Sequence, residues 1–140
     1  MATAVYWDAS AILSLVAEDR HSTAARRRGA VEGPHLVSSL AFVEVCAVLM
    51  RLEKEHRAAA RECRLAIKSL RARPWSGLHL EPDRHLAANL AARHPLRGAD
   101  LWHLAAAATL ALELPGLELF TFDTRLATAA YAEELVQDRE

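Results

Sequence analysis

Short apolar runs recur along this chain, and each is followed by a longer segment with the apolar spacing of a helix. Runs rich in β-branched and aromatic side chains are typical of strands that are buried in a sheet. The pattern predicts strands at 5–7, 35–38, 78–80 and 117–122, with a final short strand at 135–136.

The segments between these runs carry apolar residues three or four positions apart, as amphipathic helices do. We expect helices at 11–16, 18–28, 40–50, 57–73, 83–91, 99–112 and 124–131. Strands and helices alternate throughout, and this order is typical of a parallel sheet that is covered by helices. The predicted fold is α/β, with a central parallel sheet of four to five strands and helices on both faces.

The expected helix at 40–50 is apolar at every position except Glu44, so we predict that it is buried nearly all round. An ionised carboxylate that is buried without a partner is strongly destabilising. Glu44 therefore needs a cation, a network of hydrogen-bond donors or an open cleft. A paired structural glutamate is one interpretation, and a glutamate that faces a bound metal is the one that we favour.

The expected helix at 57–73 has two contrasting faces. Successive residues turn by about 100°, which gathers the basic side chains opposite the apolar ones: Arg57, Arg61, Arg64, Lys68 and Arg71. A solvated outer surface is the default interpretation of such a stripe. The alternatives are contact with nucleic-acid phosphates or with an acidic partner protein.

Length and composition indicate one globular domain, which we assign to residues 1–140. The net charge is −1, so no global basic field marks a nucleic-acid-binding protein, and any such binding must come from local patches. Cys46 and Cys63 lack C-x-x-C spacing, and we expect buried free thiols in a reducing compartment. The pattern contains neither a signal peptide nor a membrane span, so we expect a cytoplasmic location.

Acidic residues stand at the ends of the first and fourth predicted strands. Asp8 follows the first strand and Asp123 the fourth, and because right-handed crossovers make these strands parallel, both side chains leave the sheet at one edge. Asp100 opens a helix and Glu44 lies near the second turn of another, and such helices begin at that same edge. Four carboxylates from distant parts of the chain are therefore expected in one crevice. Capping of the following helix is the alternative role for Asp8.

Carboxylates in one crevice cannot all stay ionised without compensating charge. Divalent cations resolve the conflict, because Mg²⁺ prefers oxygen ligands and usually takes one or two carboxylates while it keeps several waters. Four acids suit one or two Mg²⁺ or Mn²⁺ ions, and a pair of such ions can promote phosphodiester cleavage. The sequence has no hydroxyl–histidine–acid triad, phosphate-binding loop or zinc spacing that competes with this interpretation, and of its histidines only His103 lies near the acids.

The four acids lie within motifs that resemble those of the PIN-domain nucleases. Asp8 follows a strand in an Asp-x-Ser motif, Glu44 holds the buried helix position, Asp100 stands in Arg-Gly-Ala-Asp-Leu-Trp-His-Leu-Ala, and Asp123 stands in Thr-Phe-Asp-Thr. Each motif alone is unspecific, but four in this order and at these intervals are fairly specific. The resemblance covers nearly the whole chain, which in size and motif order looks like the toxin half of VapBC toxin–antitoxin pairs.

The resemblance implies a single PIN-like domain with Mg²⁺-dependent endoribonuclease activity that leaves 3′-hydroxyl and 5′-phosphate ends. It also implies a homodimer that is silenced by a small VapB-type antitoxin, whose C-terminal segment enters the crevice. By position, the four acids would be the catalytic residues and metal ligands. Ser10 and Thr121, whose hydroxyls stand beside two of the acids, would orient a carboxylate or a water.

His103 stands where some family members carry a further acid, one helical turn after Asp100. This departure leaves the number of bound metals, one or two, open. His103 could bind substrate or donate to a phosphate, and a satisfied structural histidine is the alternative. Arg97, in the turn before Asp100, is a candidate phosphate contact.

Other functions compete with nuclease activity. A PIN-like scaffold could bind RNA or a partner protein without cleavage, although all four acids are present. A phosphoaspartate-type hydrolase typically needs a second aspartate two residues after the first, where this chain has Ser10. A receiver domain needs an acidic pair after its first strand and a lysine late in the chain, and the last lysine here is Lys68.

Overall fold

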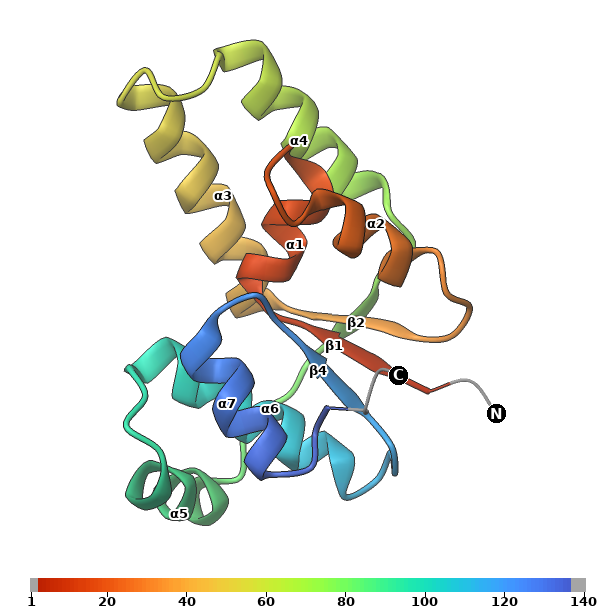
Figure 1. The fold of residues 1–140 in the computed structure, drawn as a ribbon, viewed down its shortest axis with the longest axis vertical. Helices are drawn as coiled ribbons and strands as arrows, with labels where there is room; N and C mark the ends of the chain where they lie inside the picture. The colour runs from red at the N-terminus through yellow and green to blue at the C-terminus, as the bar shows by residue number, and fades with distance from the viewer. Residues whose placement is uncertain (1–2, 137–140) are drawn as a thin grey trace.

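A computed structural model describes residues 3–136, which are built around a four-stranded parallel sheet (Figure 1). The strands are β1 (Val5–Trp7), β2 (His35–Ser38), β3 (Ser76–Leu78) and β4 (Glu118–Phe120). They lie in the order β3-β2-β1-β4, and each neighbouring pair is parallel. The prediction of an α/β fold with a parallel sheet is therefore confirmed. The predicted domain limits 1–140 extend into residues 1–2 and 137–140, which lie outside the described residues.

Helices connect the strands and cover the sheet. They are α1 (Ala9–Val16), α2 (Ser22–Gly29), α3 (Ser39–Lys54), α4 (Ala60–Ala72), α5 (Arg84–Arg93), α6 (Gly98–Ala111) and α7 (Thr124–Ala132). The helices α1, α3, α5 and α7 begin at side chains that accept a hydrogen bond from a backbone N–H in the first turn: Asp8, Ser38, Asp83 and Asp123. Each such cap contributes about 1 kcal/mol. Within residues 3–136, no helix is both long and apolar enough to cross a membrane.

Side chains alternate across the sheet, and this alternation builds two cores. Val5 and Trp7 of β1 point to one side, where they pack with residues of α1, α2, α3 and α4. Tyr6 points to the other side, where it packs with residues of α5, α6 and α7. Figure 1 shows these two groups of helices on opposite faces of the sheet. The prediction of helices on both faces is therefore confirmed.

The strand order reverses at β1. The chain passes from β1 to β2 and β3 in one direction, and β4 then pairs with the opposite side of β1. In α/β sheets, such a reversal opens a crevice at the carboxyl ends of the two strands, where ligands bind. Asp8 directly follows β1 and Asp123 lies shortly after β4, so the topology brings both aspartates to this crevice.

The third strand begins two residues before its predicted position of 78–80. Parallel pairing with β2 aligns Ser76–Leu78 with residues 36–38, so the first two positions of this outer strand are a serine and a glycine. Ser76 and Gly77 are exposed there. Apolar periodicity locates buried strands better than exposed edge strands, and this difference accounts for the shift.

The predicted strand at 135–136 is not part of the sheet. Leu135 instead follows the C-terminal turn of α7, where Glu134 has a positive φ of 59° and the Leu135 N–H donates to the Ala130 carbonyl. The Leu135 carbonyl accepts one hydrogen bond from the Leu119 N–H of β4. That single contact places Leu135 against the sheet but forms no ladder.

The helix expected at 40–50 is α3, and the prediction that it is buried nearly all round is wrong. Ala41, Val45 and Leu49 are buried, whereas Val43 is 62% exposed and Met50 is 42% exposed. Residues four positions apart thus form the one face that packs in the core. Other apolar side chains of α3 are only partly buried against this core.

The basic helix expected at 57–73 is α4, which begins at Ala60 and leaves Arg57 in the preceding turn. Cys63, Ala66 and Leu70 are buried, as the two-faced pattern predicts. The basic side chains on the opposite face are exposed. Cys46 is half-buried, and both cysteines are free thiols.

Candidate active site

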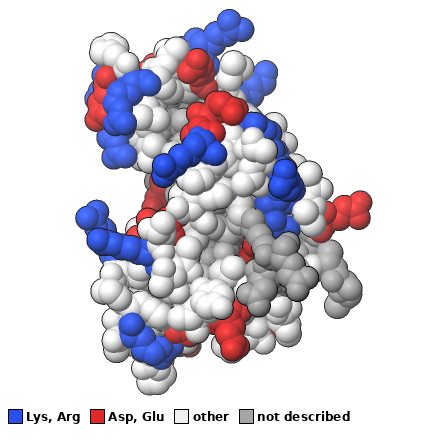
Figure 2. Space-filling view, viewed as in Figure 1, with Lys and Arg blue, Asp and Glu red and all other residues white. Residues whose placement is uncertain are grey.

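A cavity of about 260 Å³ opens at the carboxyl edge of β1 and β4. Its lining joins residues from separate parts of the chain, and all four predicted acids are among them. The polar residues of the lining are Asp8, Ser10, Glu44, Asp100, His103 and Asp123, and the apolar ones are Ala9, Leu13, Val45 and Val48. Figure 2 shows acidic side chains in the notch between the two helical layers. The structure therefore brings together carboxylates that are far apart in the sequence.

Asp8 is the most deeply buried of these acids, with 3% of its surface exposed. Its Oδ1 accepts from the Ala11 N–H at 2.9 Å and from the Ser10 hydroxyl at 2.8 Å, and its Oδ2 accepts from the Thr121 hydroxyl at 2.6 Å. A carboxylate offers roughly four positions at which its oxygens can accept. The three donors occupy three of these positions, which leaves one for a cation. Burial raises the pKa of the Asp8 carboxyl above its usual value, and the donors counteract part of that increase.

Ser10 and Thr121 join the start of α1 to the segment after β4. Their hydroxyl oxygens lie 3.2 Å apart. Ser10 Oγ accepts from the Phe122 N–H and Thr121 Oγ1 accepts from the Asp123 N–H, each at 3.0 Å. Asp123 in turn caps α7, because its Oδ1 accepts from the Leu126 N–H at 2.9 Å. One continuous set of hydrogen bonds therefore holds the carboxylates that follow β1 and β4.

Asp100 lies in the first turn of α6, and burial raises its pKa above the usual value. The nearby charge of Asp123 adds to this increase in the pKa of Asp100, whereas the charge of Arg97 opposes it. Arg97 is exposed and directly precedes α6. Among residues 3–136, no lysine or arginine forms an ion pair with any of the four acids. Their negative charge is therefore left largely to solvent, to neighbouring hydrogen-bond donors and to whatever binds the cavity.

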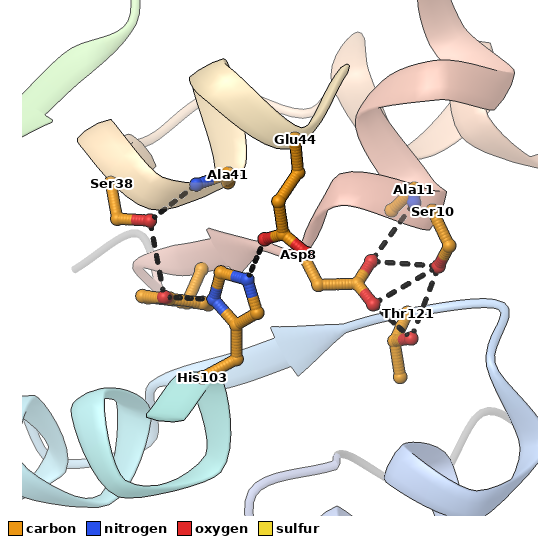
Figure 3. Close-up of polar contacts among 9 residues, drawn as sticks. Asp8, Ser10, Ala11, Ser38, Ala41, Glu44, His103 and Thr121 are labelled. Carbon is orange, nitrogen blue, oxygen red and sulfur yellow. Dashed lines mark hydrogen bonds and ion pairs between the residues drawn. The ribbon is translucent and has the colours of Figure 1, made fainter. Parts of the chain in front are cut away.

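Glu44 projects from α3 toward His103 of α6, as Figure 3 shows. Its Oε1 lies 2.6 Å from His103 Nε2, and His103 Nδ1 lies 2.6 Å from the Tyr6 hydroxyl. His103 is 1% exposed, whereas the Glu44 side chain is 29% exposed. Burial raises the pKa of Tyr6, so its phenol keeps the proton at neutral pH. The Glu44 carboxylate thus has both a hydrogen-bond partner and an open cleft.

Tyr6 is the residue of this network that the sequence pattern did not single out. It lies in β1, is fully buried, and its hydroxyl forms a hydrogen bond with His103 of α6. The available signal was the hydroxyl itself, because a tyrosine inside a buried strand needs a polar partner.

The basic residues predicted to contact substrate on the helix at 57–73 lie outside the acidic cavity. Arg61, Arg64 and Lys68 lie on α4, which packs against α1 and α3. Arg64 and Lys68 line a separate hollow of about 570 Å³, and Arg57 lines another of about 1290 Å³ at the α3–α4 turn. These hollows are larger than the acidic cavity, but neither includes the strand ends where the carboxylates meet. Size alone therefore does not identify the site.

The donor chemistry of the acidic cavity fits a hydrated divalent cation. Within the described residues, no group of three or more His, Cys, Asp or Glu side chains is already drawn together tightly enough to hold a metal ion. Mg²⁺ does not require such a group, because it keeps several waters and binds through one or two carboxylates. The four acids supply oxygen donors around a cavity that water can enter, whereas His103 is engaged through both ring nitrogens.

Known proteins are similar in sequence to this chain over most of its length. The PIN domain family matches residues 5–131. Two relatives from Mycobacterium tuberculosis are Ribonuclease VapC45 of strain CDC 1551 / Oshkosh and Ribonuclease VapC49 of strain ATCC 25618 / H37Rv. Each is 36% identical over 133 residues, which cover 91% of this chain and 90% of the relative.

Solved structures share the fold at lower identity. Mycobacterium tuberculosis VapC20, described as a sarcin-ricin loop cleaving toxin, has a TM-score of 0.63 and 19% identity, over 97% of this chain and 99% of its own. PAE2754 from Pyrobaculum aerophilum has a TM-score of 0.57 and 21% identity, over 92% of this chain and 87% of its own. At these identities the two structures support the fold alone. Because the family match and the two ribonuclease relatives each cover most of this chain, we conclude that it belongs to the PIN domain family.

Proposed function

We propose that this chain is a Mg²⁺- or Mn²⁺-dependent endoribonuclease and the toxin of a VapBC-type toxin–antitoxin pair. The proposal depends above all on the four carboxylates of Asp8, Glu44, Asp100 and Asp123, which line one cavity without an arginine or lysine ion pair among residues 3–136. A scaffold that only binds RNA gains nothing from such a concentration of negative charge. The two relatives named Ribonuclease VapC support the same assignment.

In this proposal the four acids hold one or two divalent cations, which when bound supply Lewis-acid activation of water and neutralise charge at the scissile phosphate. Ser10 and Thr121 keep the Asp8 carboxylate oriented, because both hydroxyls donate to it. Arg97 stands at the exposed start of α6 and contacts the RNA backbone. The cleaved RNA carries 3′-hydroxyl and 5′-phosphate ends.

The proposed partners are an RNA substrate and a small VapB-type antitoxin whose C-terminal segment closes the crevice. The active form in this proposal is a cytoplasmic homodimer. Exposed apolar side chains on α3, Val43 and Met50, support a protein partner near the cavity, because α3 also carries Glu44 and Val48 of its lining. The basic face of α4 is a further surface for RNA or for an acidic segment of the antitoxin.

The test is cleavage of RNA by the purified protein in the presence of Mg²⁺ or Mn²⁺. Asp8→Asn removes the carboxylate but keeps an oxygen that can cap α1, so we expect loss of cleavage with the fold retained. Asp83→Asn is the matched control, because Asp83 caps α5 through the Leu86 N–H at 2.8 Å and is not part of the cavity lining. Equal cleavage by the wild type and Asp8→Asn would assign the activity to a contaminating nuclease and favour the non-cleaving scaffold.

A second measurement tests the metal site without any substrate. A ligand that binds only the folded state raises the melting temperature. Millimolar Mn²⁺ should therefore stabilise the wild type, and this stabilisation should be lost in Glu44→Gln. A wild-type protein whose melting temperature does not respond to Mn²⁺ contradicts the proposed metal site.

A further inference from the structure

A buried pair of polar side chains holds Glu44. Tyr6 of β1 and His103 of α6 meet beneath the cavity, with the Tyr6 hydroxyl 2.6 Å from His103 Nδ1. The other ring nitrogen of His103 lies 2.6 Å from Glu44 Oε1 (Figure 3). We propose that Tyr6 and His103 are positioning residues, which fix the Glu44 carboxylate in the orientation that metal binding requires. This inference rests on the proposed function.

The direction of these hydrogen bonds follows from which groups can donate. An ionised Glu44 only accepts, so the proton between it and His103 is on Nε2. In the tautomer that carries this proton alone, Nδ1 is an acceptor, and the Tyr6 hydroxyl donates to it. Ser38 Oγ, the other neighbour of that hydroxyl, is more distant at 3.5 Å and already accepts from the Ala41 N–H at 3.0 Å. Tyr6 therefore selects the Nε2–H tautomer that Glu44 needs.

The residues of this network differ in burial: Tyr6 and His103 are buried, whereas Glu44 is partly exposed to the cavity. Tyr6 and His103 are almost completely inaccessible, so water does not compete for the hydroxyl or the ring. Glu44 lines the cavity and remains partly exposed. The same geometry argues against direct contact between His103 and an RNA phosphate, because both ring nitrogens are engaged and the residue is only 1% exposed.

Tyr6→Phe tests the role of the hydroxyl, because it removes one oxygen atom and leaves the ring in the core. We expect the dissociation constant for Mn²⁺, measured by isothermal titration calorimetry on the metal-free protein, to rise about tenfold, as is typical when an outer partner of a metal ligand is lost. Tyr131→Phe is the matched control, because Tyr131 is the other tyrosine and is exposed on α7. A dissociation constant for Tyr6→Phe equal to that of the wild type overturns the proposal.

The Glu44→Gln background distinguishes positioning of Glu44 from general damage to the fold. If Tyr6 acts through the Glu44 carboxylate, Tyr6→Phe should have no effect on the Mn²⁺ affinity that remains once this carboxylate is gone. An equal loss of affinity in both backgrounds assigns the effect to the fold and refutes the positioning role. A wild-type protein that neither binds Mn²⁺ nor cleaves RNA refutes the proposed function, and the positioning role fails with it. Normal binding and cleavage with no effect of Tyr6→Phe refutes the positioning role alone.

Two replacements of His103 test whether donation to Glu44 is the property that matters. His103→Leu removes the donor, and we expect Mn²⁺ binding about 10- to 100-fold weaker than in the wild type. His103→Gln keeps an N–H near the position of Nε2, so it should recover part of the lost affinity. Equal affinities of the two variants contradict the proposal.

The tautomer of His103 can be measured in the metal-free wild type without any substitution. Nitrogen-15 NMR shifts distinguish a protonated from an unprotonated ring nitrogen. We expect a proton on Nε2 and none on Nδ1 of His103, with a weaker preference in Tyr6→Phe. A wild-type His103 that carries its proton on Nδ1 overturns the proposal whatever the metal affinities are.

Discussion

Replacement of Thr121 by valine should destabilise the metal-free protein, because one hydroxyl contacts three neighbours. Thr121 Oγ1 donates to Asp8 Oδ2 at 2.6 Å, accepts from the Asp123 N–H at 3.0 Å and lies 3.2 Å from Ser10 Oγ. A hydrogen bond to a charged group contributes about 1.5–3 kcal/mol to stability. Valine has nearly the shape of threonine, so the change removes these hydrogen bonds and alters little of the packing.

We expect Thr121→Val to lower the free energy of unfolding by about 2 kcal/mol near neutral pH. A larger loss is not expected, because Thr121 is only half-buried and water from the cavity can replace the hydroxyl at the Asp123 N–H. For a chain of 140 residues, this change corresponds to a melting temperature about 7 °C lower. Thermal and urea denaturation in EDTA, followed by circular dichroism, measure both quantities.

The loss should depend on pH, because Thr121 donates to a carboxylate. Burial raises the pKa of Asp8, so its contribution to stability is fully present below the unfolded pKa of about 3.9 and is lost as the pH rises through the folded pKa. The Thr121 donor opposes that loss by stabilising the ionised form. The difference in unfolding free energy between the wild type and Thr121→Val should therefore grow as the pH rises from about 4.

Thr128→Val is the matched control for this experiment. The Thr128 hydroxyl is exposed and donates within α7 to the Thr124 carbonyl at 2.8 Å, so its loss should change stability by less than about 0.5 kcal/mol. Thr121→Ser keeps the hydroxyl and should retain most of the stability. The reasoning is refuted if Thr121→Val unfolds like the wild type, or if its loss of stability is the same in acid as at neutral pH.

Two further predictions concern ionisable groups. Asp100→Asn should stabilise the metal-free protein at neutral pH, because burial and the charge of Asp123 raise the pKa of Asp100 and so disfavour its ionised form. The melting temperature of Asp100→Asn should therefore exceed that of the wild type at neutral pH, and the two should be equal in acid, below the unfolded pKa of about 3.9. Equal melting temperatures at neutral pH would contradict the prediction. Glu133→Gln should destabilise the protein at neutral pH, because hydrogen bonds from His94 and Arg93 lower the pKa of Glu133. The stability that Glu133 contributes is present above its unfolded pKa and is lost as the pH falls through its folded pKa. A difference in stability between the wild type and Glu133→Gln that is as large near pH 2 as at neutral pH would contradict this prediction.

The position of the acidic residues could be predicted from the sequence, because strand ends are local features. Asp8 follows three buried strand residues, and Asp123 follows the buried run of β4. Parallel pairing then brings both to one edge, and β1 and β4 pair in this way. Neither step requires knowledge of how particular side chains pack.

The exposure of α3 could not be predicted, because apolar content does not show which face of a helix meets a neighbour. Val43 and Met50 are exposed, although they are as hydrophobic as the buried Val45 and Leu49. A helix that is apolar on nearly all sides carries no periodic signal for its orientation. The edge strand β3 was misplaced for a related reason, since it buries few apolar side chains.

The contact between Tyr6 and His103 could be predicted in part from the sequence. A buried tyrosine hydroxyl needs a polar partner, so the existence of one could be inferred from β1 alone. The identity of that partner could not be inferred, because the two residues are 97 positions apart and meet only when α6 packs against the sheet. Local patterns therefore predict the need for a partner, and long-range packing decides which residue supplies it.

Helix capping and metal binding, which compete as explanations of Asp8 in the sequence, are compatible in the structure. Asp8 caps α1 and Asp123 caps α7, each through Oδ1, while both residues line the cavity. A carboxylate at a helix N-terminus is stabilised by about 0.3–1 kcal/mol through the helix dipole, and Asp100 in the first turn of α6 has the same advantage. Three helix N-termini thus offset part of the repulsion among the acids before any cation binds. A cavity that needs a metal to balance its charge can therefore fold without one.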